Sequence, residues 1–181
     1  HKIPAATHAD WPALQMMSAI LTNGRTSRCY KALSDKNLTI NVDSFPSFNH
    51  DPSLHLITAE LAPEVKHDVV EKELHEQITK LQKDGVTAAE MSTALAGLLA
   101  RRTYMRDGSF AMAAELNECI AVGDWKLYAD LGRRLAAVTA EDVKRVAATY
   151  LVDDHSVCGW FVPTAETEPA AAEDASAPTF E

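Results

Sequence analysis

The sequence predicts an α+β fold in which a small antiparallel-type sheet is covered by a layer of several helices. Apolar residues recur at every second position in a few short segments, which is the period of a strand, while most other segments have helical spacing. The segments run helix, helix, strand, strand, then four or five helices and a last strand, so they do not alternate as in α/β proteins. The 181 residues, 46% of them hydrophobic, suffice for one domain with a core.

The chain opens with an extended segment and two helices. Residues 2–5 are typical of the end of a strand whose beginning is absent. The apolar spacing predicts a helix over Asp10–Asn23, because Pro12 is tolerated in a first turn. Gly24 favours the backbone conformation that ends a helix. A short second helix is predicted over Ser27–Lys36, with the oxygen of its first residue capping the exposed amides.

Two strands are predicted next. Apolar and polar residues alternate over Leu38–Asp43, so that Leu38, Ile40 and Val42 would share the buried face. A turn rich in Asn, Asp, Pro and Ser follows at residues 49–53, and Leu54–Leu61 is the expected partner strand.

The central part of the chain is predicted to be helical. A long helix runs from Pro63 to Gly85, which stops it. Two later helices start with a capping box, in which Thr87 pairs with Glu90 and Thr139 pairs with Asp142. The helices expected after the first long one are Thr87–Arg106, Ser109–Val122, Trp125–Val138 and Thr139–Leu151.

The C-terminal part is predicted to hold a last strand and a tail. His155–Val162 is apolar enough for a strand. From Thr164 onward Ala, Pro and Glu dominate without periodicity, which is typical of a solvated linker. We therefore expect a domain at residues 1–163 and an acidic linker or tail at 164–181. The absent Met start and the partial first strand predict a domain truncated at its N-terminus.

Charge and hydropathy argue against a nucleic-acid-binding protein and against a membrane-spanning one. The net charge is −9, but five carboxylates lie in the tail, so the body is only mildly acidic and has no basic stripe for nucleic acid. No apolar run approaches the roughly 20 residues that cross a bilayer. The cysteines at positions 29, 119 and 158 show no paired spacing and say little about disulfides or compartment.

Motifs for catalysis are absent from the sequence. None of the seven histidines begins H-x-x-E-H or H-E-x-x-H, the helical zinc motifs of metallopeptidases. There is no G-x-S-x-G elbow and no phosphate-binding glycine loop. Cys29 is interpreted as a small apolar contact; a reactive thiol would need a base and an exposed pocket.

A weak metal candidate lies on the long helix. His67, Glu71 and His75 are spaced i, i+4, i+8 and line one face. The two histidines are separated by about 12 Å of helix rise, too far to share one ion. A pair that includes Glu71 could bind metal if another segment completed the site. The alternative is a solvated face, given the charged residues around it.

The most specific pattern lies between Leu14 and Leu33, as I-L-x-x-G-x-x-S-R-x-Y-x-x-L. With G-V-T-A-A-E-M, V-T-A-E-D-V-K-R-V-A-A-T-Y-L and D-D-H-S-V-C-G-W-F-V-P further on, it resembles the C-terminal-half domain of the pitrilysin/insulinase family of zinc metallopeptidases, which includes the mitochondrial processing peptidases. The resemblance covers most of Lys2–Pro163. The signature residues are Gly24, Ser27, Arg28 and Tyr30.

The resemblance implies a function in proteolysis. Members of the family pair an N-terminal zinc domain with a homologous C-terminal domain and cleave peptides in the chamber between them. This chain would be the second, non-catalytic kind: it would contribute no zinc ligand, wall the chamber, and bind peptide or a zinc-binding domain of the same or a partner chain. The signature would serve structure, with Arg28 pairing locally and Tyr30 packing, or contact substrate or the other domain. A bacterial periplasmic location follows by analogy with longer relatives.

The sequence departs from the family at one pair of positions. Some members carry an Arg and, seven residues on, a Tyr that stabilise the reacting peptide. Here Ser34 replaces the Arg, and Ile40-Asn41 stands near the Tyr position. Direct catalytic help from this chain is therefore not expected.

Two other functions stay open. The chain could be a scaffold or interaction subunit that has lost peptidase activity, as in some relatives. It could also be a self-contained metal enzyme built on His67, Glu71 or His75, which predicts tight zinc binding by this chain alone.

Overall fold

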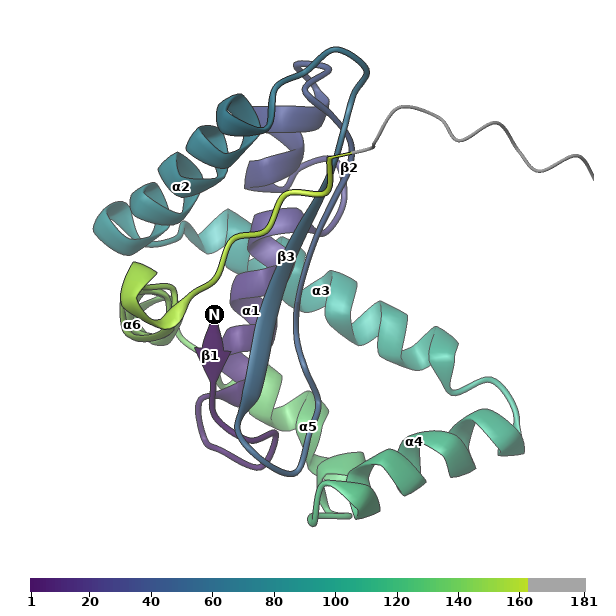
Figure 1. Cartoon of the computed structure of the whole chain (residues 1–181). Helices are drawn as coiled ribbons and strands as arrows, with labels where there is room; N and C mark the ends of the chain where they lie inside the picture. The colour runs from purple at the N-terminus through teal and green to yellow at the C-terminus, as the bar shows by residue number, and fades with distance from the viewer. Residues whose placement is uncertain (163–181) are drawn as a thin grey trace, which may run out of the picture.

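The computed structural model describes residues 1–162, so the linker expected at 164–181 lies outside the described residues. Three antiparallel strands form the sheet in the order β1-β3-β2, with β1 at Lys2–Ile3, β2 at Thr39–Pro46 and β3 at Ser53–Leu61 (Figure 1). Helices cover one face of this sheet. The predicted α+β class, with a small antiparallel sheet and a helical layer, is confirmed.

Helix α1 (Trp11–Thr22) is the centre of the core. All but two of its residues are buried, and it packs against the face of β2 that carries Val42. A helix that is apolar on nearly every side must be enclosed, and α3, α5 and α6 enclose α1 together with the sheet. Every element that borders the site described below is therefore fixed to the core through α1.

The remaining helices lie close to their predicted ranges. They are α2 (His67–Asp84), α3 (Ala88–Met105), α4 (Ser109–Ala121), α5 (Leu127–Ala136) and α6 (Ala140–Tyr150). Both predicted capping boxes are formed, at Thr87 with Glu90 and at Thr139 with Asp142. No helix within residues 1–162 is long and apolar enough to cross a bilayer.

The short second helix differs in type from the prediction. Its hydrogen bonding joins residues five positions apart, as from Asp35 N to Tyr30 O (2.9 Å), so Tyr30–Ser34 forms a single wide, π-type turn, η1. The chain then reaches β2 through Asn37, whose φ of 55° lies in the left-handed region.

The strand predicted over His155–Val162 is wrong. Asp153–His155 forms a short 3₁₀ turn, η2, and the chain continues to residue 162 without pairing to the sheet. This segment lies against α2 instead, where Trp160 Nε1 donates to Glu71 Oε2 at 3.0 Å. Apolar composition favours a strand only where a neighbouring strand can accept its backbone hydrogen bonds, and this segment lies on a helix.

The predicted alternation in the first long strand is also wrong at its start. Thr39 is buried, whereas Ile40 is 62% exposed. The pairing with β3 shifts register between Thr39 and Asn41, so the side chains at the start of the strand lie on the opposite faces from those that regular alternation through Val42 predicts. Beyond it Val42 faces the core as predicted.

Candidate functional site

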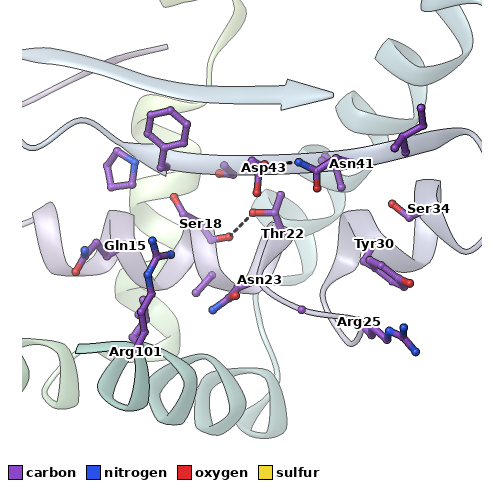
Figure 2. Close-up of a pocket in the computed structure, with 18 residues that line it drawn as sticks. Gln15, Ser18, Thr22, Asn23, Arg25, Tyr30, Ser34, Asn41, Asp43 and Arg101 are labelled. Carbon is purple, nitrogen blue, oxygen red and sulfur yellow. Dashed lines mark hydrogen bonds between the residues drawn. The ribbon is translucent and has the colours of Figure 1, made fainter. Parts of the chain in front are cut away.

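A groove of about 390 Å³ lies between α1, α3 and β2 (Figure 2). Every residue of β2 from Ile40 to Pro46 lines it. Successive side chains of a strand point to opposite faces, so a groove that contacts all of them must run along the edge of the strand. The groove therefore follows the outer edge of β2.

The edge of β2 that faces the groove carries free backbone groups. Among residues 1–162, β2 has a strand partner on one side, which is β3. The ladder continues past the strand with Ser47 N donating to Leu54 O at 2.9 Å. Because hydrogen-bonded pairs alternate along antiparallel strands, the N–H and C=O groups of Val42 and Ser44 point outward. Pro46 has no N–H and ends this row of donors.

Both walls of the groove carry polar side chains among apolar ones. Gln15 on α1 lines it, and its Oε1 is buried without a hydrogen-bond partner among the described residues. Asn41 donates to Asp43 at 2.6 Å on the strand side, and Arg101 of α3 and Arg25 of the loop after α1 are exposed at its rim (Figure 2). A buried unpaired acceptor costs about 1–3 kcal/mol, so Gln15 is poised to receive a donor from a ligand or water.

A buried histidine ties the groove's two walls together. His55 Nε2 lies 2.8 Å from Ser18 Oγ on α1 and 3.1 Å from Ser44 Oγ on β2. Burial lowers the pKa of His55 to about 4, so the ring is neutral at pH 7. No carboxylate orients its Nδ1, which is buried without a partner in the described part of the chain. A serine nucleophile needs an oriented base, so this cluster is structural.

The four signature residues divide between the groove and the core. Gly24 and Tyr30 line the groove. Gly24 has a φ of 78°, which explains the glycine at the turn after α1. Ser27 is buried and donates through Oγ to the Gly24 carbonyl at 2.7 Å. The predicted role of Ser27 as an acceptor for helix amides is therefore wrong; its hydroxyl closes the turn instead.

Arg28 holds α3 to the turn after α1. Its Nε lies 2.7 Å from Glu90 Oε1, and its Nη2 lies 3.0 Å from Glu90 Oε2 and 2.7 Å from the Gly85 carbonyl. The carboxylate of Glu90 also accepts from Thr87 in the capping box. These bonds, with Arg28 the largest contributor, lower the pKa of Glu90 to about 2. Arg28 is thus committed to structure and does not enter the groove.

Three positions singled out by the family resemblance also line the groove. Ser34 bonds Thr39 through its hydroxyl at 3.1 Å, Ile40 is exposed, and Asn41 bonds Asp43. None of them offers the charged Arg or the phenol that the resemblance describes there. Cys29, by contrast, is buried in the core, and burial raises the pKa of its thiol to about 12.

The weak metal candidates on α2 do not converge. Glu71 Oε1 lies 3.9 Å from His75 Nε2, but His75 Nδ1 is directed at Asp153 at 3.8 Å. His67 stacks on Trp160 and lies 3.2 Å from the Phe161 carbonyl oxygen. Within residues 1–162 no three such donors come close enough to share a metal ion.

Zinc, which the family resemblance implies, does not fit the groove. The residues that α1 and its C-cap present there are Gln15, Ser18, Ala19, Thr22 and Asn23. Of the side-chain types that bind zinc in proteins, which are His, Cys, Asp and Glu, the groove lining contains Asp43 alone, whereas a zinc site needs at least three such ligands. Sequence reasoning singled out several residues of the lining but not the groove itself, since Gln15 and Arg101 belong to no motif and become neighbours of β2 only through the fold.

Two comparisons, with a family profile and with a curated protein, both indicate peptidases. The sequence profile described as the peptidase M16 inactive domain matches residues 2–98. The zinc protease PqqE of Helicobacter pylori is 27% identical over 168 residues, which are 90% of this chain and 37% of PqqE. The chain thus spans little more than a third of that curated relative.

Solved structures resemble most of this chain. A candidate zinc protease from Bordetella pertussis Tohama I matches with a TM-score of 0.81 and 28% identity over 90% of this chain and 91% of that one. An inactive peptidase domain from Bordetella parapertussis matches with a TM-score of 0.81 and 25% identity over 94% and 92% of the two chains.

Proposed function

Because this chain belongs to the peptidase M16 family, as one of its inactive domains, we propose that it forms one wall of a peptide chamber whose other wall is a separate zinc-binding domain. The zinc of the working protease would be held by that other domain, since Asp43 is the one zinc-binding side chain that lines the groove and a single ligand does not hold the ion. The contribution of this chain is then to hold peptide in position.

The observation that supports peptide holding is the free edge of β2 along the groove. An extended peptide can add to such an edge as another strand, with main-chain bonds for affinity and side-chain pockets for selection. Val42 and Ser44 supply the backbone donors and acceptors, and Gln15 supplies an additional acceptor on the opposite wall. None of these groups reacts, so the peptide is bound and not cut here.

The same proposal extends to organisation and compartment. Residues 1–163 act as one half-domain, and 164–181 as an acidic connector. The compartment we propose is the bacterial periplasm, from the resemblance to longer relatives. Of the signature residues, Gly24 and Tyr30 shape the groove end, while Ser27 and Arg28 keep the turn and α3 in place.

Peptide binding can be measured directly on this chain. The probe is a fluorescein-labelled set of unstructured peptides of about eight residues, roughly one strand in length, followed by fluorescence anisotropy. The matched control is the same set N-methylated at alternate residues, which lose the donors for strand addition. We expect binding of the plain peptides and at least a tenfold weaker binding of the methylated ones.

A variant tests whether the peptide binds in the groove. Thr22 lines the groove at the C-terminal end of α1 and is partly exposed, so Thr22→Trp would fill the space without opening the core. We expect this variant to unfold like the wild type and to lose peptide binding. Equal binding of both peptide sets, or of both proteins, would contradict the proposal. Absence of binding would favour the alternative, a scaffold subunit without peptide contacts.

A further inference from the structure

Helix α4 exposes far more apolar surface than is usual for a helix on the surface of a domain. Most of its residues are apolar, yet Cys119 is the one buried side chain in it. Phe110 at its start is 87% exposed. A helix that is apolar on most sides is normally enclosed, so α4 lacks its cover in this chain.

The apolar surface continues onto the end of α3. Tyr104 is 81% and Met105 63% exposed, and Met112 of α4 lies beyond Phe110. We refer to these four residues, at the corner where α3 meets α4, as the apolar tip (Figure 1). Aromatic residues and Met are enriched in the cores of protein interfaces, and large exposed apolar patches mark interaction sites.

The apolar tip is held rigidly. Glu115 on α4 accepts from Arg102 at 2.8 Å and from Arg106 at 2.5 Å, so two cations of the α3 end bind one carboxylate. Arg106 also covers the Tyr128 ring of α5 at 4.1 Å and donates to the Tyr128 carbonyl. Because these bonds fix α3, α4 and α5 to one another, a partner would meet a preformed surface, which reduces the entropy cost of binding.

We propose that the apolar tip is the docking surface for the zinc-binding half-domain of the peptidase. This inference rests on the proposed function. It is supported by position: α3 lines the groove with Leu98 and Arg101, and the tip begins about one helical turn further on. A body seated on the tip therefore lies beside the open groove, where the second wall of a chamber belongs.

The occupant is argued from the relatives and from the chemistry of the tip. PqqE contains nearly two thirds of its length outside the region that matches this chain, which is ample for another half-domain. The tip itself carries no charged side chain, and Arg101 and Asp107, which lie near it in the sequence, are charged and exposed. The expected counterpart is an apolar face with its own polar rim. A second copy of this chain would bring the same described residues, among which no three zinc-binding side chains converge.

Photo-crosslinking in the natural protein tests the docking. We would place p-benzoyl-L-phenylalanine at position 110, irradiate cells that make the protein, and identify the crosslinked peptides by mass spectrometry. The control carries the same residue at the exposed Glu141 position of α6, away from the tip. We expect position 110 to crosslink to a domain that contains H-x-x-E-H, and position 141 not to do so. Crosslinks to a second copy of this chain, or no difference between the two positions, would overturn the proposal.

A second variant separates this inference from the proposed function. Phe110→Asp places a charge on the tip, and its exposure means that the fold should be unchanged by circular dichroism. We expect zinc-dependent peptide cleavage by the complete enzyme to fall at least tenfold, while the plain peptides bind the groove with unchanged affinity. Unchanged cleavage by Phe110→Asp would refute docking at the tip. Absence of peptide binding by the wild type would refute peptide binding in the groove, but it would not contradict docking at the tip.

Discussion

Replacing Arg28 with Met should destabilise the domain by about 2 kcal/mol at pH 7. The pKa of Glu90 falls from 4.5 to about 2, and one pKa unit corresponds to about 1.4 kcal/mol, so all its partners together stabilise the carboxylate by roughly 3 kcal/mol. Arg28 is the largest cause, and Thr87 supplies part of the remainder. The two side chains are 17% and 27% exposed, so solvent screening reduces the sum only in part.

The effect should depend on pH in a defined direction. The pKa of Glu90 is lower in the folded protein than in the unfolded chain, so this stabilisation is complete above pH 4.5 and is lost as the pH falls toward 2. Urea unfolding followed by circular dichroism at pH 7 and pH 3 measures it. The difference between wild type and Arg28→Met should shrink at the lower pH.

Two controls make the test specific. Arg28→Lys keeps the charge but cannot bind Glu90 with two parallel bonds, so it should fall between wild type and Met. Arg133→Met removes an exposed pair with Asp130 and should leave stability unchanged. Equal unfolding of wild type and Arg28→Met at pH 7, or a difference that is the same at both pH values, would refute the role assigned to Arg28.

Three further predictions follow from local geometry. Gln15→Leu removes a buried unpaired acceptor, so the free energy of unfolding measured in urea should rise by about 1 kcal/mol. Peptide binding measured by anisotropy should weaken about fivefold. A loss of stability would contradict this account. Thr139→Ala removes a formed capping box and should cost about 1 kcal/mol in the same urea assay. In the native protein Cys158 should react with a thiol reagent, because it is exposed. Cys29 should not react, because burial raises the pKa of its thiol to about 12. In urea Cys29 should become exposed and react as well.

Local signals in the sequence were reliable where the stabilising contact is itself local. Thr87 with Glu90 and Thr139 with Asp142 form capping boxes as predicted, because both partners lie within one helical turn. Gly24 ends α1 with a positive φ for the same reason. The pattern between Leu14 and Leu33 pointed to the family to which the chain belongs.

Predictions that depend on a distant partner were less reliable. The segment at 155–162 is apolar enough for a strand but lies on α2, since none of the strands within residues 1–162 pairs with it. The alternation around Ile40 failed because the pairing with β3 shifts register there. In α2, Val69 is 44% exposed whereas the adjacent Val70 is buried, because the direction of a helix against its neighbours decides which side is covered.

The sequence by itself determined the fold class, most element boundaries, the family, and the absence of a zinc motif, since each depends on residue types at short spacing. The tertiary structure decided where function could lie. Arg28 meets Glu90 across 62 positions, and Gln15 on α1 and Arg101 on α3 come to flank the free edge of β2. A groove is made of surfaces that different elements present to one another, and the packing of α1 against the sheet and α3 sets those surfaces.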